Sequence, residues 1–448
     1  MNGSEAIQAK QKNDRTTQLY EFYAEIERRT RVDADSIKTT YRSPVNFIES
    51  LQQPRHRWFP YKEGFSPSFV RSFLNDFDTS EKGLVFDPFA GSGTTAIVAG
   101  EQGRHSVGFE VSPLTSFVAK TKTIVMDKSE LKLFKSLIDD FEQSELKGSS
   151  NAPQNDTVKR YFSSGNLEAV LRVKKYFHEI TNQKHQDLFK LAYLSAIEPF
   201  STHRKAGNGV KRKTKEEYPG NLSNPILSLK NFMLSKLAMF EHDIASTRNF
   251  VGPEFRQSSS LDESQYVELE EISTLLTSPP YANCFDYSKI YMSELWLGDF
   301  FESTNDQKKF RQTSVRSHVH AHWDDRNETF GSQIVNDVIR HHIEGQELWS
   351  PRIGSMLSGY FQDLGKLLAT VKPHLKRGAH LGFVVGNSFY GGIAVATDLL
   401  LADLAAKQGY TVDSIKVYRG VIPSSQQYKL LGENRKYMRE SLVILRND

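Results

Sequence analysis

The chain lacks the features of a secreted or membrane-spanning protein. Its 448 residues contain a single cysteine, Cys284, which excludes an intramolecular disulfide framework and a multi-cysteine zinc site. No apolar run approaches the roughly 18 residues that a membrane-spanning helix needs. Residues 1–17 are polar throughout, without the apolar segment of an export signal. We therefore expect a cytoplasmic protein with no membrane contact.

An excess of charge of one sign is also missing. The sequence has 57 Lys and Arg residues against 54 Asp and Glu residues, so the charge of the whole chain does not indicate nucleic-acid binding. Only a local cluster of charge can carry such an argument. A hydrophobic content of 38% suits a globular chain with one large or two ordinary domains.

Hydrophobic patterns predict an α/β fold with a mostly parallel sheet. Residues 83–87 and 106–110 are short apolar runs, and between them lie a Gly-rich turn and a helix from about Thr94. This arrangement is the opening unit of a parallel sheet. Strand patterns return at 272–281 and 380–388, and two β-rich runs joined by a polar segment close the chain, which predicts an antiparallel C-terminal strand.

Long helical patterns dominate the middle of the chain and its beginning. Residues 125–250 show them with little β-branched alternation, which predicts an inserted helical subdomain. An appended amphipathic helix is expected from Ala6 to about Val32, and another helix should begin at Ser66-Pro67. The expected domains are an N-terminal extension at 1–40, a discontinuous catalytic domain at 41–124 and 251–448, and the insert at 125–250.

The first motif is DPFAGSGTT, at residues 87–95. Gly91 and Gly93 follow a strand, where a side chain would block a ligand, and the next helix points its free N–H groups toward that ligand. Glu110, at the end of the following strand, can accept hydrogen bonds from ribose hydroxyls. Taken alone the motif is weak, because a Gly-rich strand-helix turn without a ligand is the common alternative.

Two residues favour S-adenosylmethionine over a dinucleotide. The Asp87 carboxylate suits a cationic amino acid group and would repel a pyrophosphate, while Phe89 adds an apolar wall. The motif resembles that of the DNA amino-methyltransferases, which have a Rossmann-like methyltransferase sheet. The resemblance implies that S-adenosylmethionine is the cofactor, that Glu110 holds its ribose, and that its methionine end is lined by Asp87, Pro88, Phe89, Gly91, Gly93 and Thr94.

The second motif, TSPPY at residues 277–281, follows an apolar strand and predicts the chemistry. Its turn should open at the carboxyl edge of the sheet, where open α/β folds bind ligands. An exocyclic base amine is a poor nucleophile, and acceptors at its two protons would localise its lone pair. The Ser278 hydroxyl and the Pro279 carbonyl are those acceptors, Pro280 stiffens the loop, and Tyr281 offers a face for stacking an extruded base.

In the resembled family, Ser at the position of Ser278 accompanies cytosine-N4 enzymes, whereas Asp or Asn is more usual in adenine-N6 enzymes. We therefore expect methylation of cytosine N4, with adenine N6 as the alternative. A cytosine-C5 mechanism needs a cysteine directly after a proline, but residues 281–283 separate Cys284 from Pro280. Cys284 is therefore expected to be a loop residue and not a nucleophile.

The resemblance extends to other segments with less specificity. Residues 58–70 look like the family segment that precedes the cofactor motif, which implies that Phe65 closes the methionine pocket. The family usually has an acidic residue at the end of the third strand, but residues 255–261 read FRQSSSL here. Gln257 and Ser258 are the candidates for contact with the adenine ring. Because of this departure, the alternative remains that the chain is a catalytically inactive nucleic-acid-binding protein.

A basic segment within the insert is the candidate DNA contact. Residues 203–215 (HRKAGNGVKRKTK) have no acidic residue and are expected to form a flexible loop that grips phosphate, although a solvated charged loop is the alternative. The predicted contacts are Arg204, Lys205, Lys211, Arg212 and Lys213, with Arg316 from a later region. His318, His320, His322 and His341-His342 are not expected to bind metal, since the proposed chemistry has no use for one.

The expected function is site-specific methylation of double-stranded DNA at the exocyclic amine of a flipped base. A cognate restriction endonuclease is the expected partner, and the nucleoid is the expected place of action.

Overall fold

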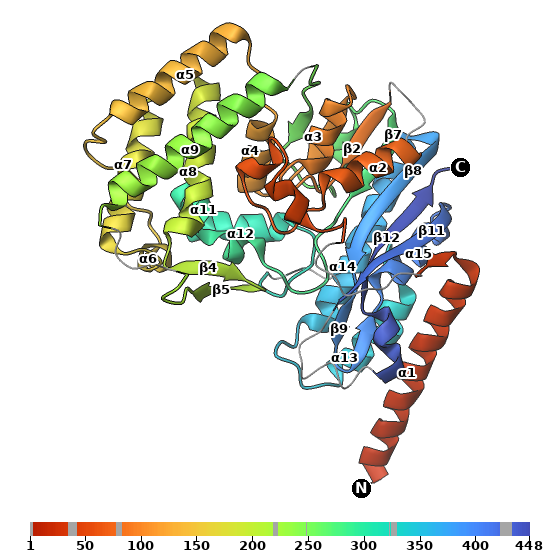
Figure 1. Cartoon of the computed structure of the whole chain (residues 1–448). Coiled ribbons are helices and arrows are strands. Elements are labelled where there is room, and N and C mark those ends of the chain that lie inside the picture. The colour runs from red at the N-terminus through yellow and green to blue at the C-terminus, as the bar shows by residue number, and fades with distance from the viewer. Residues whose placement is uncertain are drawn as a thin grey trace.

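The computed structural model describes residues 3–34, 43–77, 83–217, 223–247, 249–321, 323, 329–421 and 432–448, and side chains from residue 14 onward except Glu433. Within these ranges an eight-stranded sheet runs through the molecule, with strand order β1-β11-β12-β8-β7-β2-β3-β6. The helical middle of the chain stands to one side of this sheet (Figure 1). No helix in the described ranges has the length and apolar character needed to cross a membrane.

The strands of the main sheet are β1 (Val32–Asp33), β2 (Leu84–Asp87), β3 (Ser106–Phe109), β6 (Glu254–Arg256), β7 (Ile272–Thr277), β8 (Leu375–Gly386), β11 (Thr411–Gly420) and β12 (Arg439–Arg446). From β6 to β8 every neighbouring pair is parallel, whereas β12 is antiparallel to both β8 and β11. Because β2 and β7 are parallel neighbours, the segments that follow their last residues lie at the same edge of the sheet.

Helices cover both faces of the sheet, because the side chains of buried strands alternate between the faces. Val85 and Leu276 pack with α2 (Pro67–Phe77) and α3 (Thr94–Glu101) in one cluster. Leu84, Phe86 and Leu275 belong to the cluster on the other face. That cluster includes residues of α1 (Gly3–Arg29), α14 (Ile353–Val371) and α15 (Thr397–Lys407).

A second core holds the helical middle of the chain together. It is built from α4 (Pro113–Lys122), α5 (Lys128–Gln143), α6 (Asp156–Arg160), α7 (Ser164–His178), α8 (Gln183–Phe200) and α9 (Pro225–Ser246). Asp243 on α9 accepts hydrogen bonds from the Arg55 backbone N–H at 3.0 Å and from the Trp58 indole N–H at 2.8 Å. It also pairs with Arg57. This one carboxylate therefore ties the helical region to the segment before α2.

Shorter elements complete the chain. The helical ones are η1 (Phe47–Leu51), η2 (His56–Trp58), η3 (Glu263–Tyr266), α10 (Tyr287–Ile290), α11 (Met292–Leu297), α12 (Thr304–Thr313), the π-helical η4 (Val335–Arg340), α13 (His341–Glu344), η5 (Lys372–His374) and η6 (Gly432–Tyr437). Two small hairpins are formed by β4 (His203–Ala206) with β5 (Gly209–Arg212) and by β9 (Ser388–Tyr390) with β10 (Ile393–Val395).

The expected α/β class, the mostly parallel sheet and its antiparallel C-terminal strand are confirmed. Ser66 caps α2 as expected, since its hydroxyl accepts the Phe69 backbone N–H at 3.2 Å. The first helix, however, ends at Arg29, and Val32 instead pairs with Ile415 of β11. Strand β8 begins at Leu375, earlier than expected, because its first residues include an exposed Lys-Arg-Gly stretch that hides the strand from a hydrophobic pattern.

The basic segment is not the flexible loop that its glycines suggested. It forms the β4–β5 hairpin, and Gly207, with φ of +56°, occupies the first central position of a two-residue turn. Type II′ turns require a positive φ at that position, which glycine adopts without strain. The polar connection expected between the last two strands lies largely outside the described residues, as does His322.

A buried ion pair fastens the C-terminal strand to α15. Arg439 Nε lies 2.7 Å from Asp398 Oδ2, and both side chains are almost fully buried. Asn387 and Ser441 donate further hydrogen bonds to the same carboxylate, and Arg439 reaches Glu27 on α1. The pair therefore joins the first helix, the last strand and the helix between them.

We predict that Asp398→Ala lowers the free energy of unfolding by about 3–5 kcal/mol, because it removes the fully buried carboxylate from Arg439 and leaves only the partly exposed Glu27 beside the guanidinium. Urea unfolding followed by circular dichroism measures the change. The control is Asp33→Ala, which removes the exposed Arg31–Asp33 pair and should cost well under about 1 kcal/mol. Equal losses in the two variants would contradict the role given to the buried pair.

Candidate active site

The turn after β2, residues 88–93, is called the glycine turn here. Gly91 has φ of +51°, and a Cβ placed there would lie 3.1 Å from the Tyr61 ring. Gly93 has φ of +84°, and its Cβ would lie 3.0 Å from that of Ala119 on α4. Gly91 therefore allows Tyr61 to approach the turn. A side chain at Gly93 would collide with α4, so glycine is needed there for packing, and its contact with a cofactor stays a prediction.

Asp87 links the glycine turn to the strand beside it. Its Oδ1 accepts hydrogen bonds from the Phe89 backbone N–H at 3.1 Å and from the Thr277 hydroxyl at 2.6 Å. Thr277 is the last residue of β7, directly before the Ser-Pro-Pro-Tyr turn at 278–281. Burial raises the pKa of Asp87 to about 6, against the lowering effect of these hydrogen bonds. The two motifs are thus joined by a direct side-chain contact.

Glu110 follows the end of β3 and faces the glycine turn. Its two carboxylate oxygens accept backbone N–H groups of Gly91 and Ser112, each at 2.8 Å. Burial raises the pKa of Glu110 to about 7 although both hydrogen bonds lower it. These two hydrogen bonds hold the Glu110 carboxylate in place at the same edge of the sheet as that of Asp87.

The Ser-Pro-Pro-Tyr turn is held by β8 and the C-terminal strands. The Ser278 hydroxyl donates to the Val384 carbonyl at 3.2 Å, and the Tyr281 hydroxyl donates to Glu440 Oε1 at 2.7 Å. Glu440 also pairs with Arg419. A Cβ at Gly386 would lie 2.7 Å from the Tyr281 ring, so glycine is required where the ring crosses β8. These contacts fix the direction of the Tyr281 ring.

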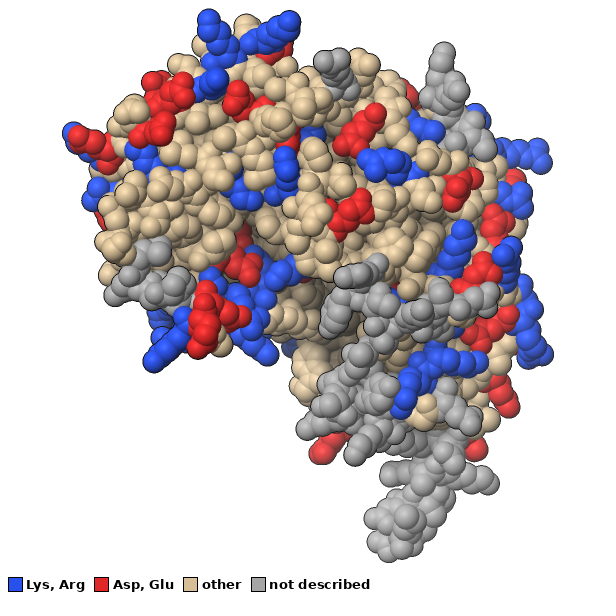
Figure 2. Space-filling view, viewed as in Figure 1, with Lys and Arg blue, Asp and Glu red and all other residues tan. Residues whose placement is uncertain are grey.

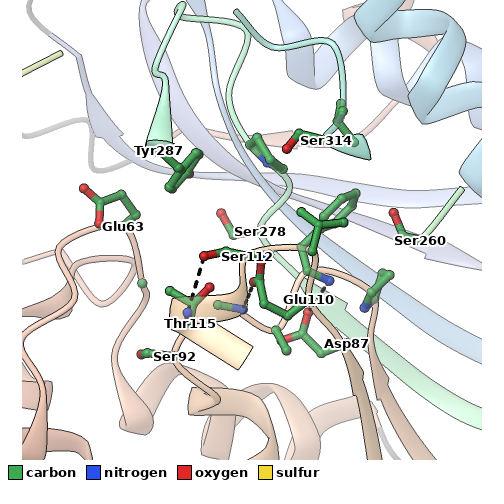
Figure 3. Close-up of a pocket in the computed structure, with 18 of the residues that line it drawn as sticks. Glu63, Asp87, Ser92, Glu110, Ser112, Thr115, Ser260, Ser278, Tyr287 and Ser314 are labelled. Atoms are coloured by element: carbon green, nitrogen blue, oxygen red, sulfur yellow. Dashed lines mark hydrogen bonds between the residues drawn. The ribbon is translucent and has the colours of Figure 1, made fainter. Parts of the chain in front are cut away.

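Two cavities meet at these turns, and they are named the inner pocket and the outer cleft. The inner pocket is lined by residues 88–92 of the glycine turn and by Asp87, Glu110, Ser112 and Thr115, among others. The outer cleft, with a volume of about 1010 Å³, is lined by Tyr281, Pro279 and Glu440 among others. The residues common to both are Glu63, Gly64, Phe65, Ser278 and Tyr287. Figure 3 shows Ser278 between the Glu110 side of the inner pocket and Tyr287.

Most residues predicted to hold the cofactor come together in the inner pocket. Phe65, Asp87, Pro88, Phe89, Gly91, Thr94 and Glu110 all line it. Gly93 and Ser258 do not. Ser259 and Ser260 take the place expected for Ser258, because the chain after β6 turns these later side chains toward the pocket.

Several lining residues carry no motif of their own. Tyr61, Glu63 and Tyr287 lie on irregular or short helical segments, and their position in the pocket depends on tertiary packing. The Glu63 carboxylate accepts the Tyr291 hydroxyl at 2.5 Å, and burial raises its pKa. The FPYKEG sequence before Phe65 is the only signal that could have drawn attention to Tyr61 and Glu63.

The β4–β5 hairpin points its basic side chains in two directions. Lys211 and Arg212 are exposed, and Arg204 pairs with Glu217 on the surface. Lys205 points inward and pairs with Glu198 and Glu294, and these carboxylates raise its pKa although burial would lower it. Figure 2 shows Lys and Arg side chains gathered over the hairpin, with acidic side chains among them.

Lys213 and Arg316 are also engaged within the protein. Lys213 Nζ donates to the backbone carbonyls of residues 198, 199 and 201. Arg316 forms a paired contact with the buried Asp363, with Nη2 and Oδ1 2.7 Å apart. Of the residues predicted to bind DNA, the structure therefore leaves Arg204, Lys211 and Arg212 toward solvent and turns the other three inward.

The side chains of Cys284 and His318 are both buried and uncharged near pH 7. The Cys284 thiol is packed beside Met356 and Tyr390, and burial raises its pKa to about 11, so it is a neutral thiol near pH 7. This agrees with the expectation that it is not a nucleophile. His318 lines the inner pocket, and burial lowers its pKa to about 4, so its ring is neutral there.

Sequence comparisons show that the chain is similar to DNA methyltransferases. Residues 7–116 match the N6/N4 methyltransferase family model, described as DNA methylase. The type II methyltransferase M.AvaI of Nostoc sp. is 24% identical over 454 residues, covering 96% of this chain and 94% of that protein. The type II methyltransferase M.BsoBI of Geobacillus stearothermophilus is 24% identical over 465 residues, covering 92% and 89%. These matches support the DNA amino-methyltransferase family.

The part of the chain that matches the model of this amino-methyltransferase family includes Phe65 and the glycine turn, and it ends before the Ser-Pro-Pro-Tyr turn. Among solved structures, the rRNA methyltransferase aviRa from Streptomyces viridochromogenes aligns over 89% of this chain and 90% of its own. Its sequence identity is 10% and the TM-score is 0.31.

The two raised carboxyl pKa values predict a pH dependence of stability. The folded chain keeps protons on Glu110 and Asp87 up to about pH 7 and 6, whereas their ordinary pKa values are 4.5 and 3.8. Between these limits these two carboxyls make the folded state bind more protons than the unfolded state, so their contribution to the free energy of unfolding should fall as pH rises. Urea unfolding of the wild type and of a Glu110→Gln variant at pH 5, 6, 7 and 8 isolates the contribution of Glu110.

Glu110→Gln should remove the contribution of Glu110 to the pH dependence of the free energy of unfolding. The difference in this free energy, variant minus wild type, should therefore be more positive at pH 8 than at pH 5. Glu254→Gln, which changes an exposed carboxyl on β6, is the matched control and should keep the wild-type slope. A Glu110→Gln variant with the full wild-type slope would show that this carboxyl does not titrate in the expected window.

Proposed function

We propose that this chain is an S-adenosylmethionine-dependent, site-specific DNA methyltransferase that modifies the exocyclic N4 amine of a flipped cytosine. The observation that carries the proposal is the position of Ser278, which borders both the inner pocket and the outer cleft. A group at this boundary can contact a substrate in one cavity and lie beside a donor in the other. The type II methyltransferase relatives support DNA as the substrate.

The inner pocket has the chemistry needed for S-adenosylmethionine. Asp87 and Glu110 supply two carboxylates for a cationic amino acid group and for ribose hydroxyls, and Phe89 and Val111 supply apolar surface. Gly91 lets the Tyr61 ring pack against the turn, and that ring forms part of the pocket wall. The bound cofactor supplies an electrophilic methyl group on a sulfonium.

Ser278 is suited to accept a hydrogen bond from a base amine. Its own proton is directed to the Val384 carbonyl, so the lone pairs of the hydroxyl oxygen remain for an incoming N–H. The neighbouring Pro279 contributes a carbonyl and, as a proline, has no N–H to compete for the same acceptors. Two acceptors on one amine would favour the pyramidal geometry in which its nitrogen lone pair is available for attack.

Tyr281 is proposed to stack on the flipped base in the outer cleft. Its hydroxyl is fixed by Glu440 and its ring edge lies against Gly386, so the ring has one orientation. Base stacking on an aromatic ring contributes about 1–3 kcal/mol, comparable to the few kcal/mol that flipping costs. The cleft volume of about 1010 Å³ leaves room for a nucleotide.

Cytosine is favoured over adenine by the serine itself, since in the resembled family Ser at this position accompanies cytosine-N4 enzymes. The exposed side chains of the β4–β5 hairpin are proposed to contact DNA phosphates, and the helical insert at 125–250 to carry part of the sequence recognition. A cognate restriction endonuclease remains the proposed partner.

The deciding experiment is incubation of the purified protein with methyl-labelled S-adenosylmethionine and double-stranded plasmid DNA, followed by nucleoside analysis. We expect label in N4-methylcytosine. Label in N6-methyladenine would agree with a DNA amino-methyltransferase but overturn the choice of cytosine. Absence of label from the DNA would overturn the proposed function.

The division of roles between the two turns predicts opposite effects of two substitutions. Tyr281→Ala should lower kcat at least about tenfold through lost stacking, with little change in the Kd of S-adenosylmethionine. Asp87→Ala should raise that Kd at least about tenfold through loss of a buried carboxylate partner. Isothermal titration and steady-state kinetics measure both quantities.

Tyr281→Phe is the control for Tyr281→Ala, because it keeps the ring and removes only the hydroxyl bonded to Glu440. It should retain most of the turnover. If Tyr281→Ala and Asp87→Ala changed cofactor affinity equally, the assignment of one turn to the base and the other to the cofactor would be wrong.

A further inference from the structure

Trp349 is an exposed aromatic side chain on the outer cleft. Its relative exposure is 66%, and it lines the cleft together with Tyr281 and Ser278. The other large apolar side chains that are exposed among the described residues are Ile48, Leu51, Val125, Leu133, Leu227 and Val267, and none of them lines this cleft. An indole held in water beside a binding cavity is typical of a surface that meets a partner.

The loop that carries Trp349 is anchored on both sides. It joins α13 to α14, and Leu348 packs against the main core directly before the tryptophan. The Gln346 side chain donates to the His342 carbonyl at 3.3 Å, and Arg352 Nη1 donates to the Val319 carbonyl at 3.3 Å. The indole is therefore presented to solvent by a fixed backbone, which lowers the entropy lost when a partner stacks on it.

The tip of the β4–β5 hairpin also borders the cleft. Gly207 and Asn208 line it, and the Asn208 side-chain amide donates at 2.9 Å to the carbonyl of Asn283, two residues after the Ser-Pro-Pro-Tyr turn. Lys211 and Arg212, on the same hairpin, are exposed cations that suit DNA phosphates. A duplex held by the hairpin over the cleft would thus meet Trp349 at the cleft border.

We propose that Trp349 stacks into the DNA at the position vacated by the flipped base. This inference rests on the proposed function and extends it to the remaining duplex. Tyr281 stacks on the extruded base, and Trp349 stacks on the base pairs that stay in the DNA helix. Extrusion separates the two neighbouring base pairs and exposes their faces, and an inserted apolar side chain replaces part of the lost stacking.

The test compares wild type, Trp349→Ala and Trp349→Phe on two duplex oligonucleotides, whose sequence is taken from the modified plasmid sites. One duplex is fully paired, and the other carries an abasic site opposite the target base, which lowers the cost of extrusion. Val267→Ala is the matched control, because it removes an exposed apolar side chain away from the cleft. Thermal unfolding of each variant checks that the fold is intact.

On the paired duplex, Trp349→Ala should lower kcat/KM by about tenfold or more, and Trp349→Phe should retain most of the activity, since stacking on an aromatic ring is tolerant of ring type. On the abasic duplex the defect of Trp349→Ala should shrink to about threefold or less. Val267→Ala should match wild type on both substrates.

Tryptophan fluorescence gives a second readout that does not depend on turnover. Of the four tryptophans, Trp58 and Trp296 are almost fully buried, whereas Trp323 is partly exposed like Trp349. The quench is therefore measured in a Trp323→Phe background, where the DNA-dependent signal should come chiefly from Trp349 and should be largely lost when Trp349→Phe is added. Wild-type activity in Trp349→Ala, or an equal defect on both duplexes, would overturn the inference while leaving the methyltransferase proposal standing. Absence of methyl transfer by the wild type would instead overturn the proposed function.

Discussion

The hydrogen bond between Thr277 and Asp87 is the contact on which the arrangement of the site depends. It joins the last residue of β7 to the last residue of β2, two strands that are adjacent in the sheet and far apart in sequence. Parallel pairing puts both strand ends at one edge, and this bond sets the distance between the turns that follow. Ser278 thereby reaches the boundary between the inner pocket and the outer cleft.

The surrounding structure fixes each turn from its far side. The glycine turn is held by Glu110, which accepts the Gly91 N–H, and by Tyr61, which fills the space beside Gly91. The Ser-Pro-Pro-Tyr turn is held by β8 through Val384 and by β12 through Glu440. The antiparallel strands at the C-terminal end of the chain therefore act on the site indirectly, by orienting the ring that faces the cleft.

Local sequence signals predicted the elements that local interactions determine. Ser66-Pro67 marks the start of α2, and the apolar runs at 84–87 and 272–277 are short strands buried on both faces. The charge of the basic segment indicates a solvated loop, whereas its Gly207-Asn208 pair is a two-residue hairpin signal, and the hairpin is what forms. The inward direction of Lys205 and the exposure of Trp349 depend on Glu198, Glu294 and Leu348, whose positions only the folded chain defines.

The order of strands in the sheet also affects how the chain can fold during synthesis. Strand β12 follows β11 in sequence, yet it lies between β11 and β8. The hydrogen-bonding edge of β8 therefore stays open until residues 439–446 have left the ribosome and inserted between two strands already made. Because the glutamate that orients Tyr281 lies on this late strand, a nascent chain could form the inner pocket well before the outer cleft takes its final shape.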